Sequence, residues 1–245
     1  MQTALLSMVS LIAGFIGSLM SGGSIIIFSL LTFLDLPVQT AVGTLKVAIT
    51  ALTFVSSVTY YRGGAVEVES APYLVASSIL GALAGSYFFA SLSERTAGMV
   101  SLLFLFAGVY VSLKGEPEGL IFTVKKAHRL GISAAGFLIG VYIGILGIAS
   151  TLIVIAALRA FFGMDMLQAN GTAKILIFFN NLTAAVVYGL GGNIDYALVA
   201  PLLVPVCIGA WIGARAAMKL GGEKLRWVYL LIGSATALKL LSELF

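Results

Sequence analysis

The chain has 245 residues, of which 60% are hydrophobic and only 10% are charged, whereas soluble domains carry about 25% charged residues. Its mean hydropathy is +1.09, and apolar runs of roughly 20 residues, enough to cross a bilayer, follow one another along the chain. This composition excludes a soluble globular domain and predicts an all-α, polytopic membrane protein. Basic residues in short loops account for the net charge of +4, which favours membrane orientation over nucleic-acid binding.

The cysteine content and the first apolar run narrow the class further. Cys207 is the single cysteine, which excludes a disulfide framework and cysteine-rich metal sites, and we expect neither a metal nor a cofactor. The first apolar run continues past Gly14 without a cleavage site, so we expect it to be retained rather than removed as a signal peptide.

Two apolar stretches are too long for one crossing and are interrupted near their centres by small residues. Residues 3–35 contain Ser21, Gly22, Gly23 and Ser24, and residues 130–162 contain Gly147, Ala149, Ser150 and Thr151. Each stretch forms either a hairpin of two short helices or one bent, discontinuous helix, and such backbone must face protein or a water-filled cavity. Three further segments follow each stretch, giving about ten helical pieces: 37–61, 71–90 and 95–113, then 165–190, 196–214 and 227–243.

The two halves of the chain repeat one another at an offset of 128 residues. AVGTLKVAIT around Lys46 matches ANGTAKILIF around Lys174, and Tyr60 with two glycines matches Tyr188 with two glycines. Chance similarity between apolar sequences rarely aligns Gly-Thr-x-Lys and Tyr-x-x-Gly-Gly in one register, so a duplicated unit is predicted.

The basic residues predict how the duplicated unit sits in the membrane. If the 114–129 linker lies in the cytoplasm, ten basic residues are cytoplasmic and only Arg95 and Lys239 lie outside the cell. The inside set is Lys114, Lys125, Lys126, Arg129, Arg159, Arg215, Lys219, Lys224, Arg226 and Arg62. We therefore expect transmembrane repeats at 1–113 and 130–245 with inverted topology, a multi-pass protein of the plasma membrane, and both termini outside.

Lys46 and Lys174 are the candidate binding residues. Each lies nine residues after the start of its segment, about 14 Å along a helix at 1.5 Å per residue, which is close to the membrane midplane. All Asp and Glu residues fall in loops or at segment ends, so no fixed counterion is expected at that depth. The lysines would then serve either as an anion-binding pair or as buried amines bonded to backbone carbonyls at the broken helices.

The residues around the lysines suit an oxyanion. Hydroxyl and amide donors within one turn are Thr44, Thr172 and Asn170, while Gly43 and Gly171 allow close approach to the backbone. Both breaks would start half-helices whose positive ends bind anions. Taken singly, Gly and Thr also pack transmembrane helices, and Asn181 with Thr53 either lines the site or bonds between helices.

The chain resembles the TauE/SafE family, also described as sulfite exporters or toluene-sulfonate uptake permeases. The resemblance rests on GFIGSLMSGGSIIIFSLL, the AVGTLK and ANGTAK motifs, and NNLTAAVVYGLGGNIDY followed by VPVCIGAWIGARAAMKL. It implies an inverted-repeat transporter of small sulfur-containing anions such as sulfite, sulfonates or sulfoacetate.

A secondary anion transporter is thus the leading hypothesis, with a small anion and the lipid bilayer as partners. The sequence leaves open whether copies associate as a homo-oligomer. An anion channel and a non-transporting assembly factor are the alternatives. No nucleotide-binding loop is present, and an enzyme is not expected because no acidic or histidine side chain accompanies a nucleophile within a segment.

Overall fold

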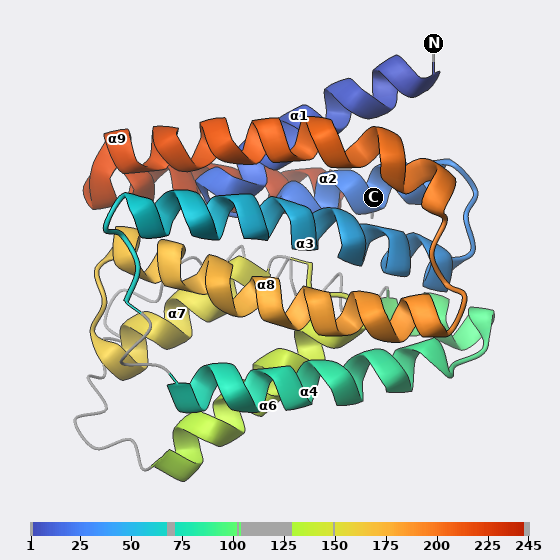
Figure 1. The fold of residues 1–245 in the computed structure, drawn as a ribbon, viewed down its shortest axis with the longest axis horizontal. Helices are drawn as coiled ribbons and strands as arrows, with labels where there is room; N and C mark the ends of the chain where they lie inside the picture. The colour runs from blue at the N-terminus through green and yellow to red at the C-terminus, as the bar shows by residue number, and fades with distance from the viewer. Residues whose placement is uncertain (1, 68–71, 102, 104–128, 149, 243–245) are drawn as a thin grey trace.

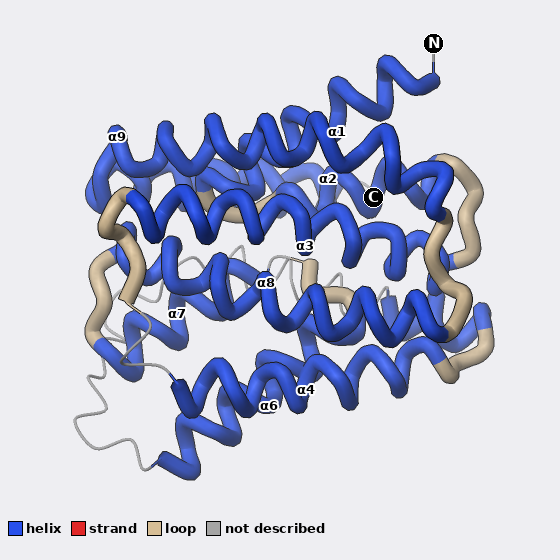
Figure 2. The backbone as a smooth tube through the Cα atoms, in the orientation of Figure 1, coloured by secondary structure: helices blue, strands red, loops and turns tan. Residues whose placement is uncertain are grey.

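The computed structural model describes residues 2–67, 72–101, 103, 129–148 and 150–242 (Figure 1). Within these ranges the chain is helical and contains no strand (Figure 2). The helices are α1 (Gln2–Leu19), α2 (Gly23–Phe33), α3 (Val38–Arg62), α4 (Pro72–Ala90), α6 (Arg129–Ile145), α7 (Ser150–Phe162), α8 (Met166–Leu190) and α9 (Tyr196–Ser242).

Four helical spans are long and apolar enough to cross a membrane: Val38–Arg62, Pro72–Ala90, Met166–Leu190 and Tyr196–Gly221. Shorter apolar helices accompany them. The prediction of an all-α, polytopic membrane protein is confirmed.

Two predicted segments differ from the structure or fall partly outside the described residues. Most of the segment expected at 95–113, and the linker expected at 114–129 apart from Arg129, lie outside the described residues. The segment expected to end at residue 214 instead continues to Gly221, where the backbone leaves the helical region at φ 73° and ψ 170°. The prediction stopped before Arg215, but an arginine near a helix end extends its guanidinium to the membrane surface without ending the helix.

Each interrupted apolar stretch forms a pair of helices. The first break has Gly22 at φ 111°, directly before α2, and the second has Gly147 at φ 69°, shortly before α7. Glycine adopts such positive φ values without a steric penalty. Because α2 has 11 residues and α7 has 13, they measure about 16 and 20 Å, short of the roughly 30 Å bilayer core.

The helices of the two halves interleave. Helix α1 packs against α9, α4 against α6, and α3 against α8, so each half is completed by the other. In Figure 1 the neighbouring helices α3 and α8 run in opposite directions, as do their successors α4 and α9.

Glycines allow these helix pairs to approach closely. A Cβ on Gly81 or Gly85 of α4 would overlap backbone atoms of α6, and a Cβ on Gly209 or Gly213 of α9 would overlap backbone atoms of α1. The contacts correspond between the halves, and small residues at such positions are typical of membrane helix packing. The carbonyl groups involved are those of Phe137, Val141, Leu11 and Phe15.

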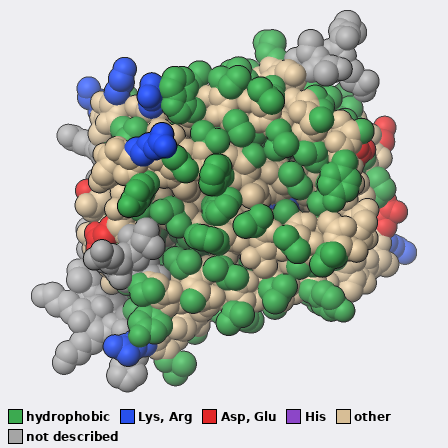
Figure 3. Space-filling model, viewed as in Figure 1, with side chains coloured by type: hydrophobic (Ala, Val, Ile, Leu, Met, Phe, Trp, Pro, Cys, Tyr) green, Lys and Arg blue, Asp and Glu red, His purple; other side chains and the backbone are tan. Residues whose placement is uncertain are grey.

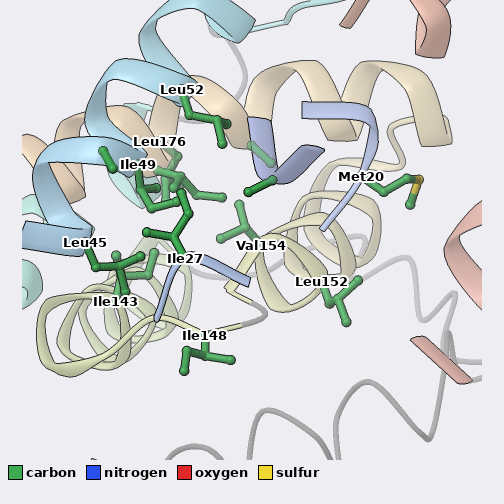
Figure 4. Close-up of a cluster of buried hydrophobic side chains, with 14 of the residues drawn as sticks. Met20, Ile27, Leu45, Ile49, Leu52, Ile143, Ile148, Leu152, Val154 and Leu176 are labelled. Atoms are coloured by element: carbon green, nitrogen blue, oxygen red, sulfur yellow. The ribbon is translucent and has the colours of Figure 1, made fainter. Parts of the chain in front are cut away.

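The buried core lies at the centre, where both helix pairs meet α3 and α8. Figure 4 shows Ile49 and Leu52 of α3, Leu176 of α8, Ile27 of α2 and Ile143 of α6 gathered in one cluster. On the face seen in Figure 3, hydrophobic side chains cover the middle of the molecule, and most visible Lys and Arg side chains lie at its left end. This distribution suits a protein surrounded by lipid.

Candidate anion-binding site

The two lysines lie at equivalent places in α3 and α8 and are almost fully buried, each 1% exposed. Lys174 Nζ donates hydrogen bonds of 2.7 Å to the carbonyl oxygens of Gly17 and Met20. Lys46 Nζ donates to the carbonyl oxygens of Ile143 and Leu146, the latter at 2.9 Å. Each lysine therefore reaches into the opposite half of the chain.

These carbonyls belong to the C-terminal ends of α1 and α6, at the two breaks. The last carbonyl groups of a helix have no partner within the helix, and the partial negative charge there favours a cation. In this conformation each ammonium group thus satisfies and neutralises one broken helix end. This is the carbonyl-bonded arrangement that the sequence left open as an alternative.

Two tyrosines bind the same helix ends from within their own halves. The hydroxyl of Tyr60 donates to the Ser18 carbonyl at 2.9 Å, and the hydroxyl of Tyr188 donates to the Gly144 and Ile145 carbonyls at 3.3 and 3.1 Å. Both side chains are fully buried. A lysine from one half and a tyrosine from the other therefore hold each hairpin.

The Gly-Thr pairs beside the lysines form a different contact. The hydroxyl oxygen of Thr44 accepts the backbone N–H of Asp195 at 3.0 Å, and that of Thr172 accepts the backbone N–H of Glu67 at 2.9 Å. A Cβ on the preceding glycine, Gly43 or Gly171, would overlap a carbonyl oxygen of the same opposite loop. The Gly-Thr pair of α3 therefore packs against the loop that follows α8, and the pair of α8 packs against the loop that follows α3.

A cavity opens between the two breaks, at the centre of the structure. Its polar and small lining residues come from both hairpins, from α8 and, with Thr53, from α3, and its apolar residues come mainly from α3. The lining residues are Gly17, Ser21, Gly22, Gly23, Ser24, Leu45, Ile49, Leu52, Thr53, Leu146, Gly147, Ser150, Thr151, Lys174, Ile177 and Asn181.

The structure brings many of the predicted site residues to this cavity, but not all of them. Eight line it: Ser21, Gly22, Gly23, Ser24, Ser150, Thr151, Lys174 and Asn181. Lys46 lies next to it, since its Nζ is 3.3 Å from the position of a Cβ on the lining residue Gly147.

The other five predicted residues lie outside the lining. Four are the Gly-Thr residues of the loop contacts, Gly43, Thr44, Gly171 and Thr172. The fifth, Asn170, donates its side-chain amide to the Leu19 carbonyl and the Tyr60 hydroxyl at 3.0 and 2.9 Å. The observed contacts of these five residues link one half of the chain to the other.

The apolar residues of the lining are not among the predicted site residues. Ile49 and Ile177 each lie three residues after a motif lysine and both line the cavity. Because residues three and four positions apart share a helix face, the positions of the lysines were enough to predict that these isoleucines face the cavity. Thr53 and Asn181, seven residues after each lysine, extend the same face and line the cavity.

The cavity is small in this conformation. Its volume is about 20 Å³, while one water molecule needs roughly 10–15 Å³ on this measure. It therefore has room for one or two water molecules and is too narrow for sulfite or a sulfonate.

The electrostatics of the cavity favour negative charge. Helices α2 and α7 both begin on its surface, at Gly23 and Ser150, and helix N-termini carry a partial positive charge with free N–H groups. The negative ends of α1 and α6 are neutralised by the lysines. Among the described lining residues there is no Asp or Glu.

These features define a class: a multi-pass membrane protein with a central polar cavity between two broken helix pairs. Comparison with known proteins agrees with this class. The family model described as "Sulfite exporter TauE/SafE" matches residues 6–240. The chain therefore belongs to the TauE/SafE family of membrane transporters, as its motifs predicted.

Similar curated proteins carry consistent names. A "Probable membrane transporter protein YdhB" of Bacillus subtilis is 27% identical over 218 residues, covering 85% of this chain and 86% of that protein. A "Probable membrane transporter protein" of Haemophilus influenzae is 25% identical, covering 91% and 88%. A "Probable membrane transporter protein YfcA" of Escherichia coli K12 is 23% identical, covering 96% and 88%. No solved structure matches the chain.

Proposed function

We propose that this membrane transporter is a secondary carrier of small sulfur-containing anions, organic or inorganic, such as sulfite, sulfonates or sulfoacetate. The observation that carries the proposal is the central cavity, where two helix N-termini and a lysine lining the wall meet without a carboxylate among the described lining residues. The size and charge of a sulfur oxyanion suit such a site once it widens.

The lysine contacts suggest how an anion could enter the cavity and be bound there. In the observed conformation, Lys46 and Lys174 donate hydrogen bonds to the carbonyl ends of the opposite hairpins. An entering anion offers each ammonium an acceptor with a full negative charge, which attracts the ammonium more strongly than the partial charge of a carbonyl oxygen does. The anion therefore competes with the carbonyls, frees the hairpin ends and takes the N–H groups of α2 and α7 as further donors.

Alternating access follows from the duplicated arrangement. The two halves place corresponding helix pairs on opposite sides of one cavity, and α3 runs opposite to α8 (Figure 1). We propose that repeats 1–113 and 130–245, joined by a cytoplasmic linker at 114–129, have inverted topology and move in turn, with both termini outside a plasma membrane. The gathering of Lys and Arg side chains at one end (Figure 3) supports that orientation.

The test is anion flux in proteoliposomes loaded with sulfite, thiosulfate, sulfoacetate or taurine in turn. Asn181→Leu and Thr151→Val remove cavity polar groups, and Lys174→Arg replaces a compact ammonium by a broader guanidinium. We expect all three variants to lose most transport of whichever anion the wild type carries. Thr172→Val, whose hydroxyl lies outside the cavity lining, is the matched control and retains transport per folded molecule.

Two outcomes would overturn the proposal. Unchanged flux in the three cavity variants would remove the site, and absence of flux for every anion in the wild type would remove the substrate class. Flux far above carrier turnover would instead identify the anion channel alternative.

A further inference from the structure

A second hollow lies away from the central cavity, where the C-terminal part of α3 meets α9. It is an open groove of about 600 Å³. Its walls include Phe54, Val58 and Arg62 from α3, and Trp211, Arg215 and Met218 from α9. The helices touch at its floor, since a Cβ on Gly63 would overlap the Sδ atom of Met218.

The mouth of the groove is basic. Arg62 is in the last turn of α3, and Arg215 lies six residues before Gly221; both side chains are exposed. The guanidinium carbon of Arg215 is 4.1 Å from the ring centroid of Trp211. Stacking on an aromatic face holds a guanidinium in place while its N–H edge stays available to a phosphate. Among the described residues neither arginine has a carboxylate partner.

The rest of the groove is apolar and faces outward. Phe54 lies eight residues before Arg62, about 12 Å deeper along the helix at 1.5 Å per residue, and its side chain is 52% exposed. Val58 lies between the two on the same face and is half-buried. The groove thus passes from two cations at the membrane surface to exposed apolar side chains at the depth of acyl chains.

The internal repeat shows that the helix packing does not require these arginines. At the offset of 128 residues, Arg62 corresponds to Leu190, and Arg215 and Trp211 correspond to Tyr87 and Leu83. The corresponding helix pair, α4 with α8, packs together without a basic residue at either position. The cations are therefore a feature of one groove, not of the fold.

We infer that the groove between α3 and α9 binds an anionic phospholipid, with the phosphate between Arg62 and Arg215 and an acyl chain along Val58 and Phe54. Charge complementarity selects the headgroup, and the apolar wall selects a lipid over a soluble anion. Basic pockets between membrane helices are suited to such headgroups. This site is separate from the proposed transport cavity, and its test does not depend on transport.

The test measures lipid binding to the purified full chain by native mass spectrometry, comparing phosphatidylglycerol with phosphatidylcholine of the same acyl chains. We expect the wild type to prefer phosphatidylglycerol, and Arg62→Gln and Arg215→Gln each to weaken that binding about 5-fold. Arg215→Lys keeps the charge but loses the fork that stacks on Trp211, so we expect a smaller loss.

Lys219→Gln is the matched control, because it removes one positive charge from the same helix and does not line the groove. If it weakens binding as much as the arginine variants, the effect is a general surface potential and the site is wrong. Equal binding by wild type and the Arg62→Gln/Arg215→Gln double variant would also overturn it. Glycerol 3-phosphate competing at the affinity of the lipid would show that the apolar wall contributes nothing, which contradicts a lipid site.

Discussion

Lys174 and Met20 lie 154 residues apart in the sequence, yet the lysine Nζ donates a 2.7 Å hydrogen bond to the Met20 carbonyl oxygen. Lys46 makes the corresponding bond to the Leu146 carbonyl at 2.9 Å. The lysine of each half therefore fixes the hairpin of the other half, and neither hairpin can move without breaking or carrying these bonds. A rearrangement that opens the cavity on one side is thus coupled to the opposite repeat.

Replacing one lysine should destabilise the protein as well as impair transport. Lys174→Met keeps the length of the side chain but leaves the Gly17 and Met20 carbonyls without their donor, and an unsatisfied buried acceptor costs about 1–3 kcal/mol. We expect a clear decrease in thermal unfolding temperature in detergent, and a similar decrease for Lys46→Met. An unfolding temperature equal to that of the wild type would show that the lysine bonds carry no net stability.

The motif glycines should tolerate no side chain. Gly43→Ala and Gly171→Ala place a Cβ against the carbonyl oxygens of Asn193 and Ala65, and overpacking of this kind costs about 1–3 kcal/mol. We expect both variants to lower the yield and thermal stability of folded protein by similar amounts, because the contacts correspond.

Gly131→Ala is the control for the glycine variants, since Gly131 is also helical and a Cβ there meets nothing within 4 Å. It should leave stability unchanged or raise it slightly. If Gly131→Ala destabilises as much as Gly43→Ala, the interpretation of close packing at the motif is wrong.

The sequence could predict which residues are special better than it could predict what they contact. The paired motifs identified both lysines, and the small-residue breaks fell where α2 and α7 begin. The sequence predicts Thr44 and Thr172 as donors to an anion, whereas in the structure their hydroxyl oxygens accept the backbone N–H groups of Asp195 and Glu67. That contact joins residues 105 and 151 positions apart, and local periodicity carries no information on such pairs.

A constant repeat offset also concealed the match between the hairpins. Gly17 and Met20 correspond by their lysine bonds to Ile143 and Leu146, an offset of 126 rather than 128. One residue of this difference arises at the breaks, since three residues separate α1 from α2 and four separate α6 from α7, and the other arises between the start of each short helix and the start of the long helix that follows. At the offset of 126, Ser7 and Gly14 of α1 coincide with Ser133 and Gly140 of α6, whereas at 128 no residue of α1 is identical to its partner.

The threonines of the motifs should affect stability more than transport. Thr172→Val removes the oxygen that accepts the Glu67 N–H at 2.9 Å, at a cost of about 1 kcal/mol. We expect a lower unfolding temperature with transport per folded molecule retained. Asn181→Leu should show the reverse, because Asn181 lines the cavity and, among the described residues, its amide donates only to the Ile177 carbonyl of its own helix. Flux and thermal unfolding measured on the same preparations decide between these patterns.

Cysteine labelling should show that the breaks of both hairpins can be reached from either side of the membrane. In a Cys207→Ala background, which removes the single native thiol, Ser24→Cys tests the first hairpin and Thr151→Cys the second. Because both residues line one cavity, which in the proposed cycle opens to each side of the membrane in turn, we expect a membrane-impermeant thiol reagent to reach both variants from outside and from the cytoplasm.

Right-side-out and inside-out vesicles provide the measurement, and surface positions provide the controls. Ser91→Cys, exposed after α4, should react only from outside, and Lys219→Cys, exposed near the end of the α9 span, only from the cytoplasm. A transported anion should slow labelling of both hairpin cysteines, since it occupies the cavity that they line. Labelling of the Ser24→Cys and Thr151→Cys variants from one side of the membrane only, with the controls behaving as expected, would reject alternating access through this cavity.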